Sequence, residues 1–201
     1  IISFEGDFVF FAYILALGKF FNIIMALDTG SSFEGMGASR EALFSLIAEP
    51  AFFIMIGSLS LLTGYSSFAD IFGSIYLGSY ISYCIAVMSA IILIVIAMVE
   101  NSRMPVDDPK THLELTMIHE VMILDNSGFD LGLILYTTNL KFAVYGALLA
   151  NLMFSLSDNL MFIIPMFLVI QLLFAVLVGI MESFTARFRM NHNSQFIFIL
   201  T

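Results

Sequence analysis

The chain has 201 residues, of which 60% are hydrophobic, 14% aromatic and only 11% charged, and its mean hydropathy is +1.01. Soluble domains are about 45–50% apolar and about 25% charged, so this composition excludes an ordinary water-soluble globule and excludes disorder. The 16 acidic and 7 basic residues give a net charge of -9, which excludes a basic surface for nucleic acid. A polytopic membrane protein remains.

The chain has a single cysteine, Cys84, inside an apolar run. One thiol forms no intramolecular disulfide and supplies no CxxC pair or thiolate set for iron, nickel or zinc. We therefore expect the chain to bind no cofactor and any redox centre to belong to another polypeptide. The first apolar run has full span length and no small-residue cleavage site after it, so we expect no signal peptide.

Five stretches are long and apolar enough to cross a bilayer, which takes about 20 residues. They are Phe8–Leu27, Leu43–Gly64, Leu77–Val99, Phe129–Met153 and Leu160–Phe184. If successive spans cross the membrane in opposite directions, the basic residues of the connectors all lie on one side. An excess of Lys and Arg marks that side as cytoplasmic. Those residues are Arg40, Arg103, Lys110, Arg187 and Arg189. The sequence therefore predicts an all-α, multi-pass protein of the cytoplasmic membrane.

Two connectors have a composition of their own. Ser66–Tyr76 is too short to span and mixes apolar residues with Asp70 and serines at helical spacing, which predicts a short surface helix on the outer side. Asp28–Gly37, DTGSSFEGMG, is rich in glycine and serine and predicts a flexible hinge between the first two spans.

Two lysines lie deep within predicted spans. Lys19 is in the first span and Lys141 in the fourth, and each would cost a few kcal/mol if it faced lipid. Both are roughly 12 Å or more from either end of the span, at 1.5 Å per residue. A buried lysine needs a carboxylate partner or loses its proton. Both lysines are therefore expected to face protein or water and are candidates for an ion relay, although snorkelling to the interface is the alternative.

The second span begins with a polar stripe. Glu41, Ser45 and Glu49 are spaced four apart and so lie on one helix face that enters the membrane from the cytoplasmic side. Two turns separate the carboxylates by about 12 Å, so proton transfer between them would need Ser45 or ordered water. The alternative for Glu41, and less so for the deeper Glu49, is an ion pair with Arg40 at the helix end.

The stretch from Glu100 to Gly128 combines charge with helix breakers. It starts with a carboxylate at the end of a span, passes a loop stiffened by Pro105 and Pro109, and enters a helical segment over about Leu113–Leu124. Twelve residues rise only about 18 Å and cannot span alone. We expect a half-helix lining a polar cavity, with a break at Asn126-Ser127-Gly128.

This half-helix carries polar groups on two faces. His112, Thr116 and His119 share one face with Glu120 near its edge, whereas Glu114 and Asp125 fall on the opposite face. Lipid can contact neither face, so we expect water and irregular backbone here. Buried carboxylates in such a place have raised proton affinities, as a group that loads and unloads protons requires.

Other chemistries fit less well. His112, His119 and Glu120 could be metal ligands, but histidines two turns apart are about 10 Å apart, too wide for one ion without help from the backbone. The residues form no GxSxG turn for hydrolysis. The segment at Asp28 lacks the lysine of a P-loop, and its Asp-Thr-Gly has no second copy to make an aspartic protease. No repeat supports an inverted-repeat transporter.

Three motifs resemble a known family. Gly37, Ala38 and Arg40, with Glu49 nine residues on, resemble one motif of the subunit that joins the redox arm to the membrane arm in complex I and in membrane-bound nickel–iron hydrogenases. The family's second motif is matched by Glu100, Arg103, Pro105, Asp107, Pro109 and Glu114, and its closing acid-x-S-G by Asp125, Ser127 and Gly128. These motifs cover about 90 residues in the family's order and spacing.

Within that family the chain looks more like the hydrogenase branch, known as formate hydrogenlyase subunit 4. The quinone branch usually has PEAEAEL and HTEYSG in the second motif, where this chain has Lys110, Thr111 and His112, and a helical turn between His119 and Ser127. The resemblance implies one integral membrane domain over residues 1–201 that lacks upstream spans of a longer subunit.

The resemblance also implies a function. It suggests a subunit without a redox centre that couples electron transfer in a peripheral arm to proton or sodium translocation through an acidic funnel. The implied pathway residues are Glu41, Glu49, Glu100, Asp107, Glu114, Glu120 and Asp125, together with Lys19 and Lys141. The implied structural and interface residues are Gly37, Arg40, Arg103, Pro105, Pro109, His112, His119 and Gly128.

The implied partners are peripheral hydrogenase-type large and small subunits on the cytoplasmic face, which would carry iron–sulfur clusters and the nickel–iron centre. Antiporter-like membrane subunits and lipid would surround the chain. Two alternatives stay open: the quinone-site subunit of an NADH-quinone oxidoreductase, and a stand-alone secondary ion transporter.

Overall fold

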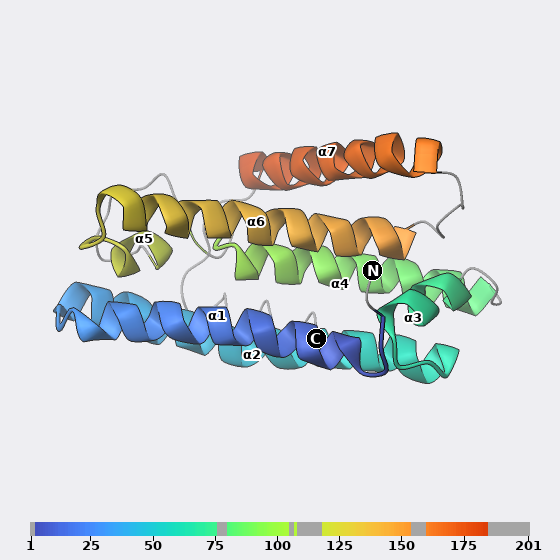
Figure 1. The fold of residues 1–201 in the computed structure, drawn as a ribbon, viewed down its shortest axis with the longest axis horizontal. Coiled ribbons are helices and arrows are strands. Elements are labelled where there is room, and N and C mark those ends of the chain that lie inside the picture. Colours follow the sequence, from blue (N-terminus) through green and yellow to red (C-terminus); the bar gives the residue numbers. More distant parts are fainter. Residues whose placement is uncertain (1–2, 76–79, 105–106, 108–117, 154–159, 185–201) are drawn as a thin grey trace.

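The computed structural model describes residues 3–75, 80–104, 107, 118–153 and 160–184, and these residues form seven helices. Figure 1 shows α1 (Asp7–Asp28), α2 (Ser32–Thr63), α3 (Phe68–Ile75), α4 (Tyr80–Glu100), α5 (His119–Met122), α6 (Gly128–Met153) and α7 (Leu160–Phe184). Five of them, namely α1, α2, α4, α6 and α7, are long and apolar enough to cross a membrane. The predicted all-α architecture with five spans is confirmed.

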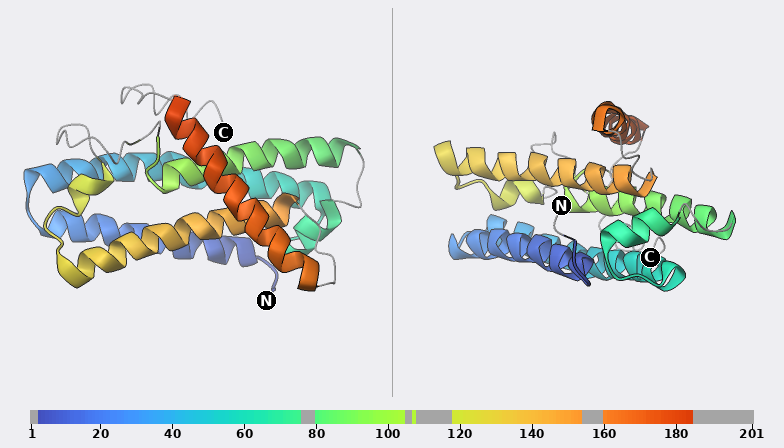
Figure 2. Two further views of the ribbon diagram at one scale, coloured as in Figure 1. Left: turned by 90° about the horizontal axis from the view of Figure 1, so that it is seen from above. Right: turned by 45° about the vertical axis from the view of Figure 1, so that its right-hand side comes forward.

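The long helices run back and forth in three layers (Figure 1). The α1–α2 hairpin forms one layer, α4 and α6 form the middle layer, and α7 crosses α6 obliquely on the outside, as Figure 2 shows from above. The main core lies between α2, α4 and α6 and includes Phe52, Leu93 and Leu149. Phe174 of α7 stacks on Phe142 of α6, with ring centroids 4.7 Å apart, and so attaches the outer helix.

The short helix α3 closes the end of the bundle opposite α5. Its apolar residues Ile71, Phe72 and Ile75 are buried, whereas Asp70 is exposed, as the amphipathic pattern predicts. The Asp7 carboxylate at the start of α1 accepts a hydrogen bond from the backbone N–H of Phe68, at 2.8 Å. This bond satisfies one of the free N–H groups at the start of α3.

The predicted hinge over Asp28–Gly37 is wrong. The helix α2 begins at Ser32, eleven residues before the predicted span start at Leu43, so only residues 29–31 join α1 to α2. Glycine and serine favour turns in isolation. Here tertiary contacts prevail, because Gly37 packs directly against the backbone of Ile118 beside α5 and the Glu34 carboxylate accepts a hydrogen bond from the N–H of Asp125.

The predicted half-helix over Leu113–Leu124 is shorter in the part of the chain that the structure describes. The helix α5 is a single turn that ends at Met122, two residues before the predicted end, and residues 113–117 lie outside the described ranges. The predicted break at Asn126-Ser127-Gly128 is present, since α6 begins at Gly128, which has a φ of 58°.

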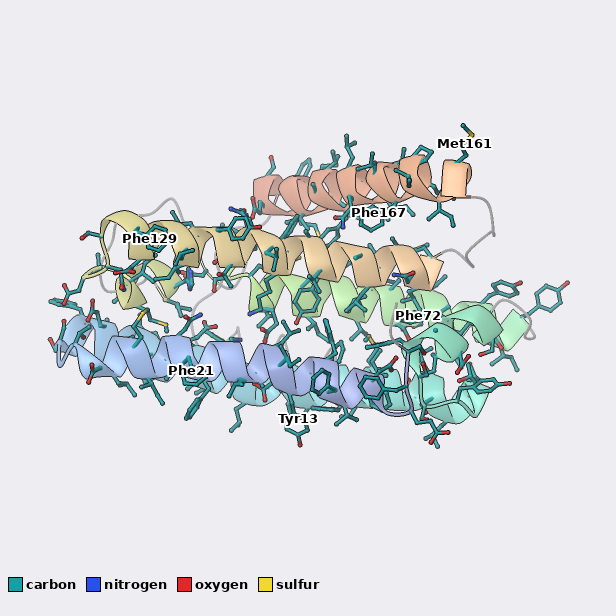
Figure 3. The ribbon with its side chains drawn as sticks, viewed as in Figure 1. Tyr13, Phe21, Phe72, Phe129, Met161 and Phe167 are labelled. Carbon is teal, nitrogen blue, oxygen red and sulfur yellow. The ribbon has the colours of Figure 1, made fainter. Side chains whose placement is uncertain are left out.

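The outer surface of the bundle is apolar. Only 6% of the most apolar stretch of α1 is buried inside the bundle. Tyr13 and Phe21 project outward from this helix (Figure 3). On the opposite side Met161 projects from α7. A soluble monomer rarely exposes apolar patches beyond a few hundred Å², whereas a lipid-facing surface is apolar throughout. The chain is therefore a multi-pass membrane protein.

Candidate functional site

The α1–α2 hairpin brings Lys19 and Glu41 to the same depth. Lys19 lies nine residues before the end of α1 and Glu41 nine residues after the start of α2, so both are about 13 Å from the connection at 1.5 Å per residue. Their Nζ and Oε1 atoms are 3.2 Å apart. The register of the two antiparallel helices therefore forms this ion pair.

Glu100, the last residue of α4, joins the pair to α6. Its Oε1 lies 2.8 Å from Lys19 Nζ and its Oε2 lies 2.8 Å from Lys141 Nζ. Lys141 also donates a hydrogen bond to the backbone carbonyl of Glu100, at 3.0 Å. Lys19, Glu41, Glu100 and Lys141 form what we call the Lys–Glu cluster, in which two positive and two negative charges from four helices balance.

The Lys–Glu cluster is buried. The side chains of Lys19, Glu41 and Glu100 are at most 8% exposed and that of Lys141 is 18% exposed. A buried ion is tolerated only when its partners compensate the lost hydration. The prediction that both lysines face protein or water is thus confirmed, because each pairs with a carboxylate. Glu41, for which Arg40 was the alternative partner, forms its ion pair with Lys19.

The helix α4 ends directly after Glu100 in a Schellman-type turn, which fixes the position of Glu100. The N–H of Arg103 donates to the carbonyl of Met98 at 2.9 Å, and the N–H of Ser102 donates to the carbonyl of Val99 at 3.2 Å. Ser102 takes the left-handed position of this turn, with a φ of 50°, where glycine is usual. Such strain in a non-glycine residue is often found at functional sites.

Two cavities adjoin on the α5 side of the Lys–Glu cluster. The first has a volume of about 150 Å³ and is lined by all four residues of the cluster. The second, of about 460 Å³, is lined by Arg103, Asp107 and Glu120, among others. Asn101, Ser102, His119 and Thr138 line both cavities.

Two buried polar atoms mark the boundary between these cavities. Asn101 Oδ1 and His119 Nε2 have no hydrogen-bond partner among the described residues. Buried polar groups are normally satisfied by protein or by ordered water, so these two atoms are candidate positions for bound water. The two cavities therefore adjoin at polar groups beside the Lys–Glu cluster.

Asp107 holds the start of α5 against these cavities. Its Oδ2 accepts hydrogen bonds from the backbone N–H groups of Ile118 and His119, at 3.2 and 3.0 Å. Burial lowers the pKa of His119 below its ordinary value of 6.5, although the negative charges of Glu41 and Asp107 oppose that shift. The imidazole at neutral pH is therefore mainly neutral.

A third, smaller cavity lies on the other side of Glu100. It has a volume of about 20 Å³ and is lined by Glu49, Glu100 and Tyr145 together with apolar residues of α1 and α2. Glu49 is half-buried. The described part of the chain thus presents cavities on both sides of the Lys–Glu cluster, one with charged side chains on the α5 side and a mainly apolar one beside Glu49.

Ser45, one of the two expected links between Glu41 and Glu49, does not join the two carboxylates directly. The Ser45 hydroxyl donates to the backbone carbonyl of Glu41, at 3.0 Å, rather than to a carboxylate. In helices, serine commonly bonds in this way to the carbonyl four residues back. Ordered water, the other expected link, stays a prediction.

Other predicted residues lie around the cluster. The Arg103 guanidinium pairs with Glu182 of α7 at 3.4 Å and lies 5.8 Å from the ring centroid of Phe142. Arg40 contacts Met36 Sδ at 3.3 Å. The side chain of Asp125 is exposed, away from the buried cluster. Pro105, Pro109, His112 and Glu114 lie outside the described residues.

Sequence reasoning missed several residues of the site. Glu34 is 1% exposed and holds the turn after α5, yet it falls in the segment interpreted as a hinge. Asn101 and Ser102 follow Glu100 directly, and Tyr145 comes one helical turn after Lys141. That spacing was the available signal for Tyr145, since residues four apart share a helix face. The described residues hold no group of three or more metal-ligand side chains.

Comparison with known proteins identifies relatives of this chain. Residues 1–200 match the family described as NADH dehydrogenase. Hydrogenase-4 component C of Escherichia coli (strain K12) is 30% identical over 192 residues, which cover 92% of this chain and 59% of that protein. Formate hydrogenlyase subunit 4 of the same organism is 28% identical over 137 residues, which cover 68% of this chain and 43% of that protein. The chain thus spans roughly half the length of these curated relatives.

Proposed function

The chain belongs to the NADH dehydrogenase subunit 1 family, and from this membership we propose that it couples electron transfer in a peripheral arm to ion translocation. The observation that carries the proposal is the Lys–Glu cluster. It is buried and charge-balanced, and it lines a cavity on the α5 side. Ionisable groups inside a membrane protein are costly and typically mark ion or proton pathways.

The ion pairs of the Lys–Glu cluster depend on the charge of each member. Glu100 shares its two oxygens between Lys19 and Lys141, so a proton that binds Glu100 removes the negative charge on which both lysines depend. Glu41 then remains as the carboxylate paired with Lys19. In a medium of low dielectric constant such a change has a strong effect on its neighbours. A shift of charge near α5 would therefore be transmitted through the cluster to Glu49.

The proposed partners follow from the names of the relatives, which are components of a hydrogenase and of a formate hydrogenlyase. We propose that hydrogenase-type large and small subunits dock on the cytoplasmic face beside α5. These subunits would carry the iron–sulfur clusters and the nickel–iron centre. Antiporter-like membrane subunits would receive the charge shift. The translocated ion would be a proton or a sodium ion.

The test is the substitution Glu49→Gln in the assembled complex, with pumping measured in membrane vesicles. We expect pumping to be lost while electron transfer to an artificial acceptor continues, because the change removes an ionisable group but no ion pair of the cluster. Glu114→Gln, at a predicted pathway residue, is expected to behave in the same way. Glu5→Gln is the matched control, since Glu5 is exposed at the opposite end of α1. Unchanged pumping in both pathway variants would remove the carboxylates from the mechanism.

A further inference from the structure

The left-handed turn at Ser102 needs support from its surroundings. Ser102 has a φ of 50°, and a non-glycine residue keeps such a conformation only where the contacts around it hold it there. On one side of the turn, Glu100 is held by Lys19 and Lys141, at 2.8 Å each. On the other side Arg103 follows Ser102 directly and closes the turn with its backbone N–H. The side chain of Arg103 is therefore placed to hold the second side of the turn.

The side chain of Arg103 is held by α6 and α7. Its Nη1 atom lies 3.4 Å from Glu182 Oε1 of α7, and its guanidinium carbon lies 5.8 Å from the ring centroid of Phe142. Phe142 directly follows Lys141 in α6 and stacks on Phe174 of α7. Phe174 and Glu182 belong to one stripe of α7, because residues eight apart lie on the same side of a helix. The helix α7 therefore holds Arg103 directly through Glu182 and indirectly through Phe142.

The Arg103–Glu182 pair is suited to fixing a position rather than to stabilising the fold. Its side chains are 34% and 25% exposed. Ion pairs with this exposure add little to the free energy of folding, because solvent screens the charges. An arginine that pairs with a carboxylate and also lies over an aromatic ring nevertheless has little freedom to move. The pair can thus restrain the turn without deciding whether the bundle folds.

We infer that Glu182 of α7 is a positioning residue for the Lys–Glu cluster. Its carboxylate holds Arg103, and Arg103 holds the left-handed turn that presents Glu100 to both lysines. This inference rests on the proposed function, in which Glu100 has to contact both lysines for a change of charge to pass between them. Glu182 itself carries no proton in this role. The helix α7, which the apolar pattern defines only as a span, becomes part of the ion-translocating site.

The test is Glu182→Gln in the assembled complex, with ions pumped per electron measured in membrane vesicles. Glutamine keeps the shape of the side chain but lacks the charge. We expect the number of ions per electron to fall by roughly 10-fold to 10²-fold, because a misplacement of about 1 Å can cost about 10²-fold. Asp130→Asn is the matched control, since Asp130 is an exposed carboxylate at the start of the neighbouring helix α6. This control is expected to pump normally.

A second substitution shows whether Glu182 acts through the turn. Glycine adopts the left-handed conformation without strain, so a glycine at position 102 makes the turn independent of the side chain of Arg103. We expect Ser102→Gly, added to Glu182→Gln, to restore most of the ions per electron that Glu182→Gln loses. A merely structural role of Glu182 in attaching α7 would not respond to this change. No recovery in the double variant would overturn the inference.

The outcomes separate this inference from the proposed function. Normal pumping per electron in Glu182→Gln, with pumping lost in Glu49→Gln, would overturn the positioning role and leave the proposed function standing. Normal pumping in both variants would overturn both. A fall in the amount of assembled complex at constant ions per electron would show that the pair only attaches α7, which also overturns the inference. If Glu182→Gln does not assemble, Glu182→Asp, which keeps the charge but is one methylene shorter, is measured with and without Ser102→Gly and judged in the same way.

Discussion

Glu100 compensates two buried lysines and also ends a helix. Its carboxylate pairs with Lys19 and Lys141, and its backbone carbonyl accepts a hydrogen bond from Lys141. Removal of one partner from a buried ion pair costs about 3–5 kcal/mol, because the other charge is left unpaired. A neutral residue at position 100 would therefore impair folding as well as the proposed ion translocation. Glu49, which is half-buried, is the more informative position for a test of pumping alone.

The sequence predicted that Lys19 and Lys141 either pair with a carboxylate or lose their protons, because an unpaired charged lysine is too costly at their depth. It did not predict which carboxylate would serve. Glu100 is 81 residues from Lys19 and 41 residues from Lys141, and only the packing of α4 against its neighbours brings it to both. The pairing with Glu41 was missed because the start of α2 was placed eleven residues too late, which hid the common register.

His119 makes the docking of α5 depend on pH. Burial holds its native pKa below the ordinary 6.5, so the unfolded segment binds a proton more readily than the docked one. The docked state is therefore fully stable above about pH 6.5 and loses stability as the pH falls from 6.5 toward the native pKa. We expect α5 to open more readily at pH 5.5 than at pH 7.5.

Hydrogen exchange at the amides of Val121 and Met122 measures this opening, after correction for the intrinsic pH dependence of exchange. His119→Gln is the control, because glutamine does not titrate in this range. In this variant the amides of Val121 and Met122 are expected to be equally protected at both pH values. Equal protection at the two pH values in the unmodified chain would contradict the assignment of a neutral, buried imidazole.

At the scale of elements, the length of the apolar runs predicted the number of spans and most of their ends. The predicted Leu160–Phe184 agrees with α7 at both ends, and Phe129–Met153 differs from α6 by one residue. The start of α2 was missed because helix propensity is a local preference, whereas the contacts of Gly37 with Ile118 are tertiary. The α6–α7 contact was equally unpredictable. There Gln171 donates to the carbonyl of Ala143 at 2.7 Å, and its amide lies where a Cβ on Gly146 would be.

The packing of α5 on α2 depends on Gly37. A Cβ at this position would lie 2.9 Å from the backbone oxygen of Ile118 and 3.0 Å from Met122 Cγ. Because a backbone oxygen cannot move aside as a flexible side chain can, we expect Gly37→Ala to weaken the docking of α5 by about 1–3 kcal/mol. Faster hydrogen exchange in Val121 and Met122 would report this loss.

Gly35→Ala is the matched control for this substitution. It lies two residues away on the same helix and has open space where a Cβ would be added. Alanine is a better helix former than glycine by about 1 kcal/mol, so this variant is expected to keep or gain stability. Equal exchange rates in the two variants would show that the close approach at Gly37 does not hold α5 in place.

At the scale of the whole molecule, the apolar outer surface and the buried charges serve different purposes. The exposed faces of α1 and α7 suit lipid or neighbouring membrane helices, whereas the charges gather where α1, α2, α4 and α6 meet. Hydropathy predicts the apolar outer surface, because it sums over many residues. The gathering of the buried charges depends on single contacts between distant helices and on the turn at Ser102, which sequence patterns do not encode.

The central claim is that buried carboxylates change their protonation when the redox partner turns over. Infrared difference spectroscopy of the assembled complex, oxidised against reduced, measures this change directly in the band of protonated carboxyl groups. We predict a difference band that is lost in Glu49→Gln and kept in Glu5→Gln. A spectrum without a carboxyl band, or with a band that is the same in both variants, would contradict the account.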